Sequence, residues 1–418
     1  MAAALHKMVR LNDTADEVDW QHGTWQRAGS GQAAATVAIT SDWAPIRRYS
    51  DAIARQPEAV YGDLAELLRR ADLRITNLEC PLTQRDTPVW KSGSELKGAP
   101  EHLGGLTTIP FEAVTLANNH VFDHGVEAFG ETTRRLDDHR IQWVGAGMTA
   151  EQAHRPLIVE IKGVRLGIVN FSEGEDLTAA GSGPGVFGWE LDRAAGIVGD
   201  LKKKGCVVLV ICHCGVEYIP FPPPYVVEAF QYMVDAGADL VIGHHPHVPQ
   251  GVQLYRGVPI CYSLGNFVFY QETDLLYRKV GYCVEAGLSP TGVNGISLVP
   301  YEIGPHGLAL LSENRRRQFF EALKAVSSPL ASAEMINAAW HGFLRRYGLA
   351  GFKAEIDMLM ERLAVDPFKG AAMFRNRVTT LQHRHHWIDA LTRIIDGTID
   401  EAPGWAMELI DTWLTQKR

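Results

Sequence analysis

The sequence lacks several signals by which common classes of protein are recognised. No apolar run approaches the roughly 20 residues of a membrane-spanning helix, so we expect no membrane span. Lys and Arg form no long run, and the formal net charge is -9. Because a nucleic-acid binder normally presents a basic face, this charge disfavours a nucleic-acid partner. A Walker A loop and a G-x-S-x-G elbow are also absent, which disfavours the nucleoside-triphosphate and serine-nucleophile sites built on those motifs.

Cysteine is scarce, and its spacing fits no zinc ribbon or redox motif. The chain has six cysteines, and Cys212 and Cys214 are separated by a single residue. Most of the six lie in apolar runs, where a free cysteine behaves as a small core residue. Residues 1–31 are polar and lack the apolar core of a signal peptide. These features predict reduced thiols and a cytoplasmic protein.

Short apolar runs alternate with amphipathic stretches over most of the chain. Residues 207–212 and 240–242 are runs of the first kind, with the β-branched content of buried strands. Residues 126–138 and 191–204 have helical spacing. The dipeptides Lys162-Gly163 and Arg256-Gly257 separate pairs of apolar runs and predict two hairpins, so the sheets should be mixed. The pattern predicts an α/β fold.

Composition divides the chain into three expected parts. Residues 1–33 form a polar lead-in, and residues 34–310 carry the alternating pattern. Residues 311–418 lack strand-like runs and show helical spacing, which predicts a C-terminal helical appendage. His383, His385 and His386 lie in a polar stretch of this part and are interpreted as solvated.

The informative feature is that the expected strands end in polar residues able to bind metal. Because ligand sites in open α/β sheets lie beyond the carboxyl ends of strands, these side chains should converge on one crevice. Singly, each has an ordinary interpretation as a helix cap or a turn residue. Together they predict one metal-binding site at the strand ends. The residues, in chain order, are Asp42, Asn77, Glu79, Asn118, Asn119, His120, Asp123, His213, Glu217, His244, His245 and His247.

The chemistry of these side chains narrows the ligand to a divalent metal. Imidazole together with carboxylate and amide oxygen suits Zn, Mn, Fe or Ni rather than Ca or Mg. The number of candidates exceeds the four ligands of a single structural zinc, which favours two ions that share a bridging carboxylate. Such a pair can activate water and hold a phosphoryl oxygen without a nucleophilic side chain.

Three sequence strings carry a family resemblance: LANNH at 116–120, GHHPH at 243–247 and YSLGNF at 262–267. With Asp42, Glu79 and His213 they resemble the CapA family, the bacterial capsule and poly-γ-glutamate synthesis proteins of the calcineurin-like metallophosphoesterase superfamily. The resemblance spans residues 35–305. It implies a four-layer αββα sandwich of two mixed sheets between helices, with metals at the strand ends.

The resemblance also implies a role for each matched residue. Asp42 and His247 would hold the first metal, Glu79 would bridge both, and His120 would protonate the leaving group. Strand-like alternation favours His245 over His244 as a ligand, because it places His245 on the same face as His247. Asp123 and Glu217 would orient imidazoles. The ligands expected at the second metal are Asn119, His213 and His245.

The chain departs from the superfamily pattern at two positions. Ala44 stands where a His is usual, and Glu79 stands where an Asp is usual. These departures predict a weaker first metal site or a site with one ion. The leading hypothesis is a metal-dependent hydrolase of a phosphoester or related bond, and the alternative is a non-hydrolytic accessory protein of γ-glutamyl or peptide polymer synthesis. In the second case the metal site would bind a carboxylate-rich chain. Both interpretations imply a small-molecule or peptide partner that is anionic.

Overall fold

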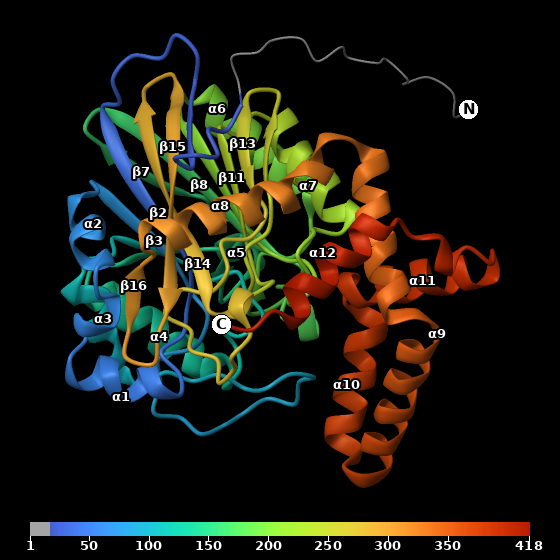
Figure 1. Cartoon of the computed structure of the whole chain (residues 1–418). Helices are drawn as coiled ribbons and strands as arrows, with labels where there is room; N and C mark the ends of the chain where they lie inside the picture. Colours follow the sequence, from blue (N-terminus) through green and yellow to red (C-terminus); the bar gives the residue numbers. More distant parts are fainter. Residues whose placement is uncertain (1–16) are drawn as a thin grey trace.

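The computed structural model describes residues 17–418, and its central feature is a pair of β-sheets packed face to face (Figure 1). The first sheet has eight strands in the order β1-β15-β14-β2-β3-β4-β5, with β16 beside β15. Strands β2 to β5 pair in parallel, and β14 and β15 pair antiparallel, so the sheet is mixed. Its strands are β1 Thr24–Gln26, β15 Gly292–Ile303, β14 Val280–Ser289, β2 Ala35–Trp43, β3 Leu73–Leu78, β4 Ala113–Thr115, β5 Gln142–Val144 and β16 Leu308–Leu310.

The second sheet has six strands in the order β12-β13-β11-β10-β8-β7. Its middle strands are parallel, and a hairpin closes each edge. The two hairpin turns are the expected dipeptides Lys162-Gly163 and Arg256-Gly257, all four residues with positive φ. Both hairpin predictions are therefore confirmed. The strands are β12 Val252–Tyr255, β13 Val258–Cys261, β11 Leu240–His244, β10 Val207–His213, β8 Val164–Ser172 and β7 Leu157–Ile161. A separate small sheet pairs β6 Ala146–Gly147 with β9 Gly185–Val186.

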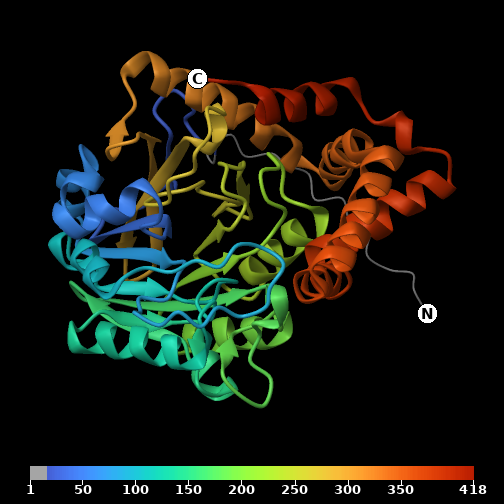
Figure 2. The ribbon, with the colours of Figure 1, turned by 90° about the horizontal axis from the view of Figure 1, so that it is seen from below.

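Helices cover both outer faces of the paired sheets (Figure 2). One buried cluster joins the first sheet to α1 Arg48–Arg55, α2 Leu64–Arg70, α3 Leu103–Thr108 and α4 Gly125–Asp138. Another joins the second sheet to α6 Leu191–Lys203 and α7 Pro224–Asp235. The short helix α5 Ala150–Ala153 precedes β7. The expected four-layer α/β class is confirmed.

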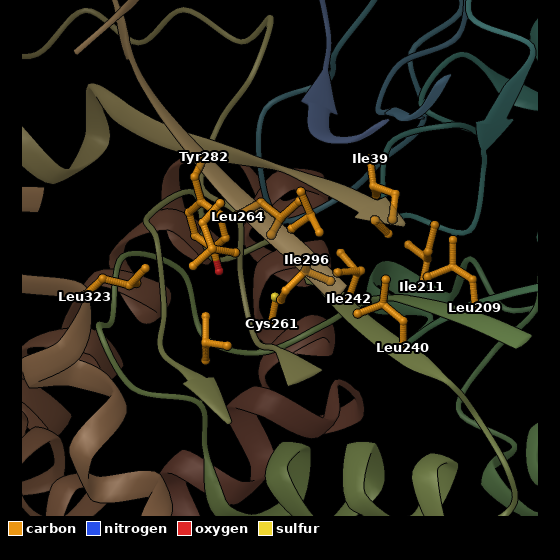
Figure 3. Close-up of a cluster of buried hydrophobic side chains, with 14 of the residues drawn as sticks. Ile39, Leu209, Ile211, Leu240, Ile242, Cys261, Leu264, Tyr282, Ile296 and Leu323 are labelled. Carbon is orange, nitrogen blue, oxygen red and sulfur yellow. The ribbon is translucent and has the colours of Figure 1, made fainter. Parts of the chain in front are cut away.

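The core between the two sheets is built by alternation along the strands. Ile39 of β2 and Ile296 of β15 come from the first sheet and meet Leu209 and Ile211 of β10 and Ile242 of β11 (Figure 3). The residues between them on β10 point to the other side, toward α6 and α7. Because each fully buried Leu or Ile side chain contributes about 1.5–3 kcal/mol, this layer holds the two sheets in a fixed relation.

The C-terminal part of the chain is helical, as expected. It comprises α8 Glu313–Ser327, α9 Ala333–Val365, α10 Pro367–Thr379, α11 Leu381–Ile395 and α12 Gly404–Thr415. Gly348, with φ 58° and ψ -170°, interrupts α9. The chain then returns to the sheets, where Trp413 stacks on Tyr277 at 3.7 Å between ring centroids. In Figure 1 the α9–α10 pair projects from the body beside the loop that follows β3.

Two details complete the comparison with the sequence. β1 lies inside the expected polar lead-in and pairs with β15, while residues 1–16 of that lead-in lie outside the described residues. Within residues 17–418, no helix combines the length and apolarity needed to cross a membrane.

Candidate metal centre

The expected site residues gather where the strands of both sheets end. On β10 the row of inward-facing side chains, which includes Leu209 and Ile211, continues to His213 at the end of the strand. The ring of His213 is therefore delivered to the space between the sheets by the same alternation that builds the core. It is buried, with 3% of its side chain exposed.

Asp42 reaches the same space through an irregularity in β2. Val37 and Ile39 face the core between the sheets, whereas Ala38 and Trp43 pack under the helices. Strict alternation would place position 42 with Ala38. The pairing of β2 with β3 shifts register between Ile39 and Asp42, and a bulge of this kind reverses the face on which later side chains lie. Asp42 is thereby turned inward.

The loop after β4 is shaped by Asn118 and presents the next two residues. The side-chain oxygen of Asn118 accepts hydrogen bonds from the backbone N–H groups of His120 and Val121, at 3.0 and 2.9 Å. Its amide donates to Asn77 Oδ1 at 3.1 Å. The side chain of Asn118 thus shapes the loop. The side-chain oxygen of Asn119 instead faces the site and lies 3.0 Å from His213 Nε2.

His245 and His247 reach the site from a loop rather than from a strand. β11 ends at His244, and His245 and His247 have φ angles of 100° and 56°. We expected strand alternation to place His245 and His247 on the same face. That reason was wrong, because the strand ends at His244. The structure nevertheless brings His245 to the site, with its Nδ1 at 3.1 Å from His213 Nε2. The carboxamide of Asn266 lies 2.8 Å from His247 Nδ1.

Two groups of potential ligand atoms result, and they share one carboxylate. The first group is Asp42, Glu79 and His247, and the second is Glu79, His213 and His245. Within each group the ligand atoms all lie within 4.8 Å of one another. Glu79 Oε1 lies 3.4 Å from His213 Nε2 and 4.0 Å from His247 Nε2, so this one oxygen faces both groups.

The charges of this cluster are not balanced by the protein. Asp42 Oδ2 and both carboxylate oxygens of Glu79 are buried without a hydrogen-bond partner among residues 17–418. Burial raises the pKa of Glu79 well above its usual value, and the nearby carboxylate of Asp42 raises it further. Burial also lowers the pKa of His213 well below its usual value. A divalent cation would supply the missing partner and lower the pKa of Glu79 again, and it would bind the neutral imidazole that burial favours at His213. These residues therefore fit a metal site.

His120 lies beside this cluster within a hydrogen-bonded group. Its Nδ1 is 2.6 Å from Asp123 Oδ2, which agrees with the expected role of Asp123 as a partner of an imidazole. Lys91, which sequence reasoning did not identify, donates to Asp123 Oδ1 at 2.7 Å and to the carbonyl oxygen of Asn119 at 2.8 Å. Lys91 is buried and ties the loop after β3 to the loop after β4.

Two expected residues are not part of the ligand groups. Glu217 is half-buried, and none of its hydrogen bonds within the described chain reaches an imidazole ring, so its orienting role stays a prediction. His244 is buried, but it belongs to neither potential ligand group. Cys214 N donates to the backbone oxygen of His244 at 3.0 Å, which continues the pairing of β10 and β11.

Sequence reasoning also missed two carboxylates that follow β8. Glu173 is half-buried, and the desolvation of its carboxyl raises its pKa to about 6. It accepts hydrogen bonds from Tyr225 Oη at 2.6 Å and Gly215 N at 2.9 Å. Glu175 begins the short 3-10 helix η3 Glu175–Leu177 and accepts from Asn119 Nδ2 at 2.9 Å. Both obey the pattern applied to the other strands, namely a polar residue just beyond a strand end, and could have been found by it.

Helix α11 requires a correction to the interpretation of its histidines as solvated. His386 is buried and packs against Tyr347, with ring centroids 4.1 Å apart. His385 stacks on Tyr225 at 4.4 Å, and His383 Nε2 lies 4.0 Å from a carboxylate oxygen of Glu175. The polar composition of the helix reflects packing against the polar margin of the site, which helical periodicity alone does not distinguish from solvent.

The fold and the site define an α/β sandwich with a buried cluster of His and carboxylate side chains that could hold metal. The family model described as bacterial capsule synthesis protein PGA_cap matches residues 35–271. The chain belongs to this family, as the sequence motifs predicted. Helices α8 to α12 lie outside the matched range.

Among curated proteins, the chain is 30% identical over 262 residues to the PGA biosynthesis protein CapA of Bacillus subtilis, covering 61% of this chain and 68% of that protein. It is 30% identical over 253 residues to the capsule biosynthesis protein CapA of Bacillus anthracis, covering 58% and 61%. A probable polyglutamine synthesis accessory protein of Mycobacterium tuberculosis is 30% identical over 236 residues, with 50% and 61% covered. The chain thus spans about two thirds or less of the length of these relatives.

Among solved structures, a 5'-nucleotidase precursor from Thermus thermophilus matches with a TM-score of 0.42 and 14% identity. The match covers 69% of this chain and 58% of that one. This likeness is too weak to support a functional conclusion.

Proposed function

We propose that the chain is a metal-dependent hydrolase that binds two divalent ions and acts on a phosphoester or related bond of an anionic small molecule or peptide. The observation that carries the proposal is the pair of ligand groups that share the buried, otherwise unpartnered carboxylate of Glu79. A bridging carboxylate between two His-containing groups is the donor set of two-metal hydrolases. Asp42 and His247 would hold the first ion, and Asn119, His213 and His245 would hold the second.

Ions such as Zn, Mn, Fe or Ni would activate water and neutralise charge on the substrate oxygens when bound there. The chain supplies the proton. With Nδ1 of His120 held by Asp123 at 2.6 Å, the ring keeps its other nitrogen, Nε2, for the leaving oxygen. Lys91 holds the backbone oxygen of Asn119, the residue before His120, and also bonds Asp123, so the loop and the partner of the ring are fixed together.

The test is elemental analysis of protein purified without chelator, together with a screen of phosphoester substrates. We expect near two metal equivalents in the wild type and a loss of metal and turnover in His213→Ala, about 10²-fold or more in kcat. His306→Ala is the matched control, because His306 is exposed on a loop. Wild-type metal content and turnover in His213→Ala would refute the proposal.

A second candidate function is favoured by the residue at position 44. Ala44 stands where phosphoesterases of the wider superfamily usually have His. On this alternative the protein is a non-hydrolytic accessory protein that binds a carboxylate-rich polymer at the metal-loaded centre.

Binding and turnover separate the two candidates. Equilibrium binding of poly-γ-glutamate to the metal-loaded protein, with no hydrolysis of any phosphoester in the presence of Zn, Mn, Fe or Ni, would favour the accessory role. Turnover that disappears in His213→Ala would favour the hydrolase.

A further inference from the structure

Glu175 occupies a position between two of the proposed ligands. Its Oε2 accepts a hydrogen bond from Asn119 Nδ2 at 2.9 Å and lies 3.9 Å from His245 Nε2. The remaining polar atoms of both residues point the opposite way. Asn119 Oδ1 and His245 Nδ1 lie 3.0 and 3.1 Å from His213 Nε2, inside the second ligand group. Glu175 therefore contacts the outer side of two residues whose inner sides face the site.

This arrangement decides which atoms of the two residues are available to a cation. An amide whose N–H group is held by a carboxylate must turn its oxygen the other way. An imidazole that keeps its proton on Nε2, next to a carboxylate, presents the lone pair of Nδ1. One carboxylate thus holds the amide of Asn119 through a hydrogen bond and faces Nε2 of His245 at 3.9 Å. His245 Nε2 has no hydrogen-bond partner at normal distance among residues 17–418, so the carboxylate of Glu175 is the acceptor available to it.

The C-terminal helices hold Glu175 from the other side. Asn376 of α10 donates from its amide to Glu175 Oε1 at 3.1 Å, and His383 of α11 lies 4.0 Å from the same oxygen. The backbone N–H of Gln382 donates to the neighbouring Glu173 at 3.2 Å. Glu175 is half-buried, with 12% of its side chain exposed, and both its oxygens are bonded, one toward the site and one toward α10.

We propose that Glu175 is a positioning residue for the second metal position, and that α10 and α11 complete its support. This inference rests on the proposed function, since it assumes that Asn119, His213 and His245 bind a cation. It assigns to the helical region, which lies outside the residues matched by the family model, a direct share in building the metal centre. Without α10, Glu175 would lose its hydrogen bond from Asn376.

The first test measures Co²⁺ binding to the full-length, chelator-treated protein by equilibrium dialysis and elemental analysis, independently of turnover. Glu175→Gln replaces an oxygen next to Asn119 and His245 by an N–H donor. That donor would bond Nε2 of His245 and so favour the tautomer with its proton on Nδ1. A proton on Nδ1 prevents this nitrogen from binding the metal. We expect the affinity of the second Co²⁺ to fall roughly 10–100-fold, with the first Co²⁺ unaffected. Glu313→Gln, at an exposed carboxylate on α8, is the matched control.

The second test changes the support and leaves Glu175 in place. Asn376→Ala removes the donor from α10, and we expect a smaller fall in affinity for the second Co²⁺ than in Glu175→Gln. Asn337→Ala is its control, because Asn337 is an exposed asparagine on α9 whose amide bonds only the backbone oxygen of Ala333. Asn376→Ala also tests the inference if Glu175→Gln fails to fold. Circular dichroism of the metal-free protein would show such a failure.

The outcomes are distinct. Wild-type protein that binds two Co²⁺ ions, with Glu175→Gln binding both at wild-type affinity, would overturn this inference and leave the proposed function standing. Wild-type protein that binds no Co²⁺ would overturn both. Loss of the second ion in Glu175→Gln with no change in Asn376→Ala would overturn the part assigned to α10.

Discussion

Glu79→Gln should have opposite effects on the stability of the protein with and without metal. In the metal-free protein the carboxylate is fully buried, its two oxygens lack partners within residues 17–418, and its pKa is raised well above the usual 4.5 by burial and by Asp42. The folded chain therefore holds a proton that the unfolded chain releases at neutral pH. Each pH unit above 4.5 at which the folded chain keeps this proton costs about 1.4 kcal/mol.

The cost at pH 7 reaches at most about 3.5 kcal/mol, and the neutral amide of the variant avoids it. We expect metal-free Glu79→Gln to unfold at a higher urea concentration than metal-free wild type at pH 7. Because the raised pKa destabilises the fold only above the unfolded-state pKa, this advantage should shrink as the pH falls from 7 to 5. With saturating Mn²⁺ the order should reverse, since only the wild type gains stability from bound metal.

The assay is urea unfolding followed by circular dichroism, in chelator and in Mn²⁺, at both pH values. Glu313→Gln, at an exposed carboxylate at the start of α8, serves as the control. The reasoning would be refuted if metal-free Glu79→Gln were less stable than wild type by about 2 kcal/mol, and if Mn²⁺ stabilised both proteins equally.

Two further predictions concern the proton donor and the backbone under the site. Asp123→Asn should lower kcat roughly 10–100-fold with unchanged metal content, because the amide no longer holds the proton of His120 on Nδ1. Metal analysis together with steady-state kinetics checks this prediction, and an unchanged kcat would contradict it. Gly243→Ala should destabilise the protein by at least about 2 kcal/mol in urea unfolding, because a Cβ there would lie 2.0 Å from the backbone oxygen of Tyr262. If Gly243→Ala had the same urea-unfolding midpoint as the wild type, β11 and the segment after β13 would be less closely packed than described.

The elements that the sequence predicts well are those set by local periodicity. Residues 126–138 and 191–204 were expected as helices and form α4 and α6. The hairpins at Lys162-Gly163 and Arg256-Gly257 follow from turn chemistry, since these residues adopt the positive φ that such turns need. Local signals of this kind depend only on neighbours along the chain.

The site was predictable in its composition because strand ends in an α/β fold share one edge. His213 is the simplest case, since alternation along β10 alone places it beside Leu209 and Ile211 on the inner face. Glu175 shows the limit of this reasoning. It follows β8 in the same way, but nothing in the local pattern indicates that its carboxylate meets Asn119 on one side and Asn376 on the other.

The sequence by itself determined the four-layer α/β class, the family and most of the residues that gather at the strand ends. Tertiary structure decided how they face one another. The register shift in β2 turns Asp42 inward, and the positive φ of His245 brings its ring to the site after the strand has ended. The physical reason is that both depend on backbone geometry imposed by pairing with distant segments. The closure of the site by α10 and α11 depends on contacts across some 200 residues, which no periodicity along the chain records.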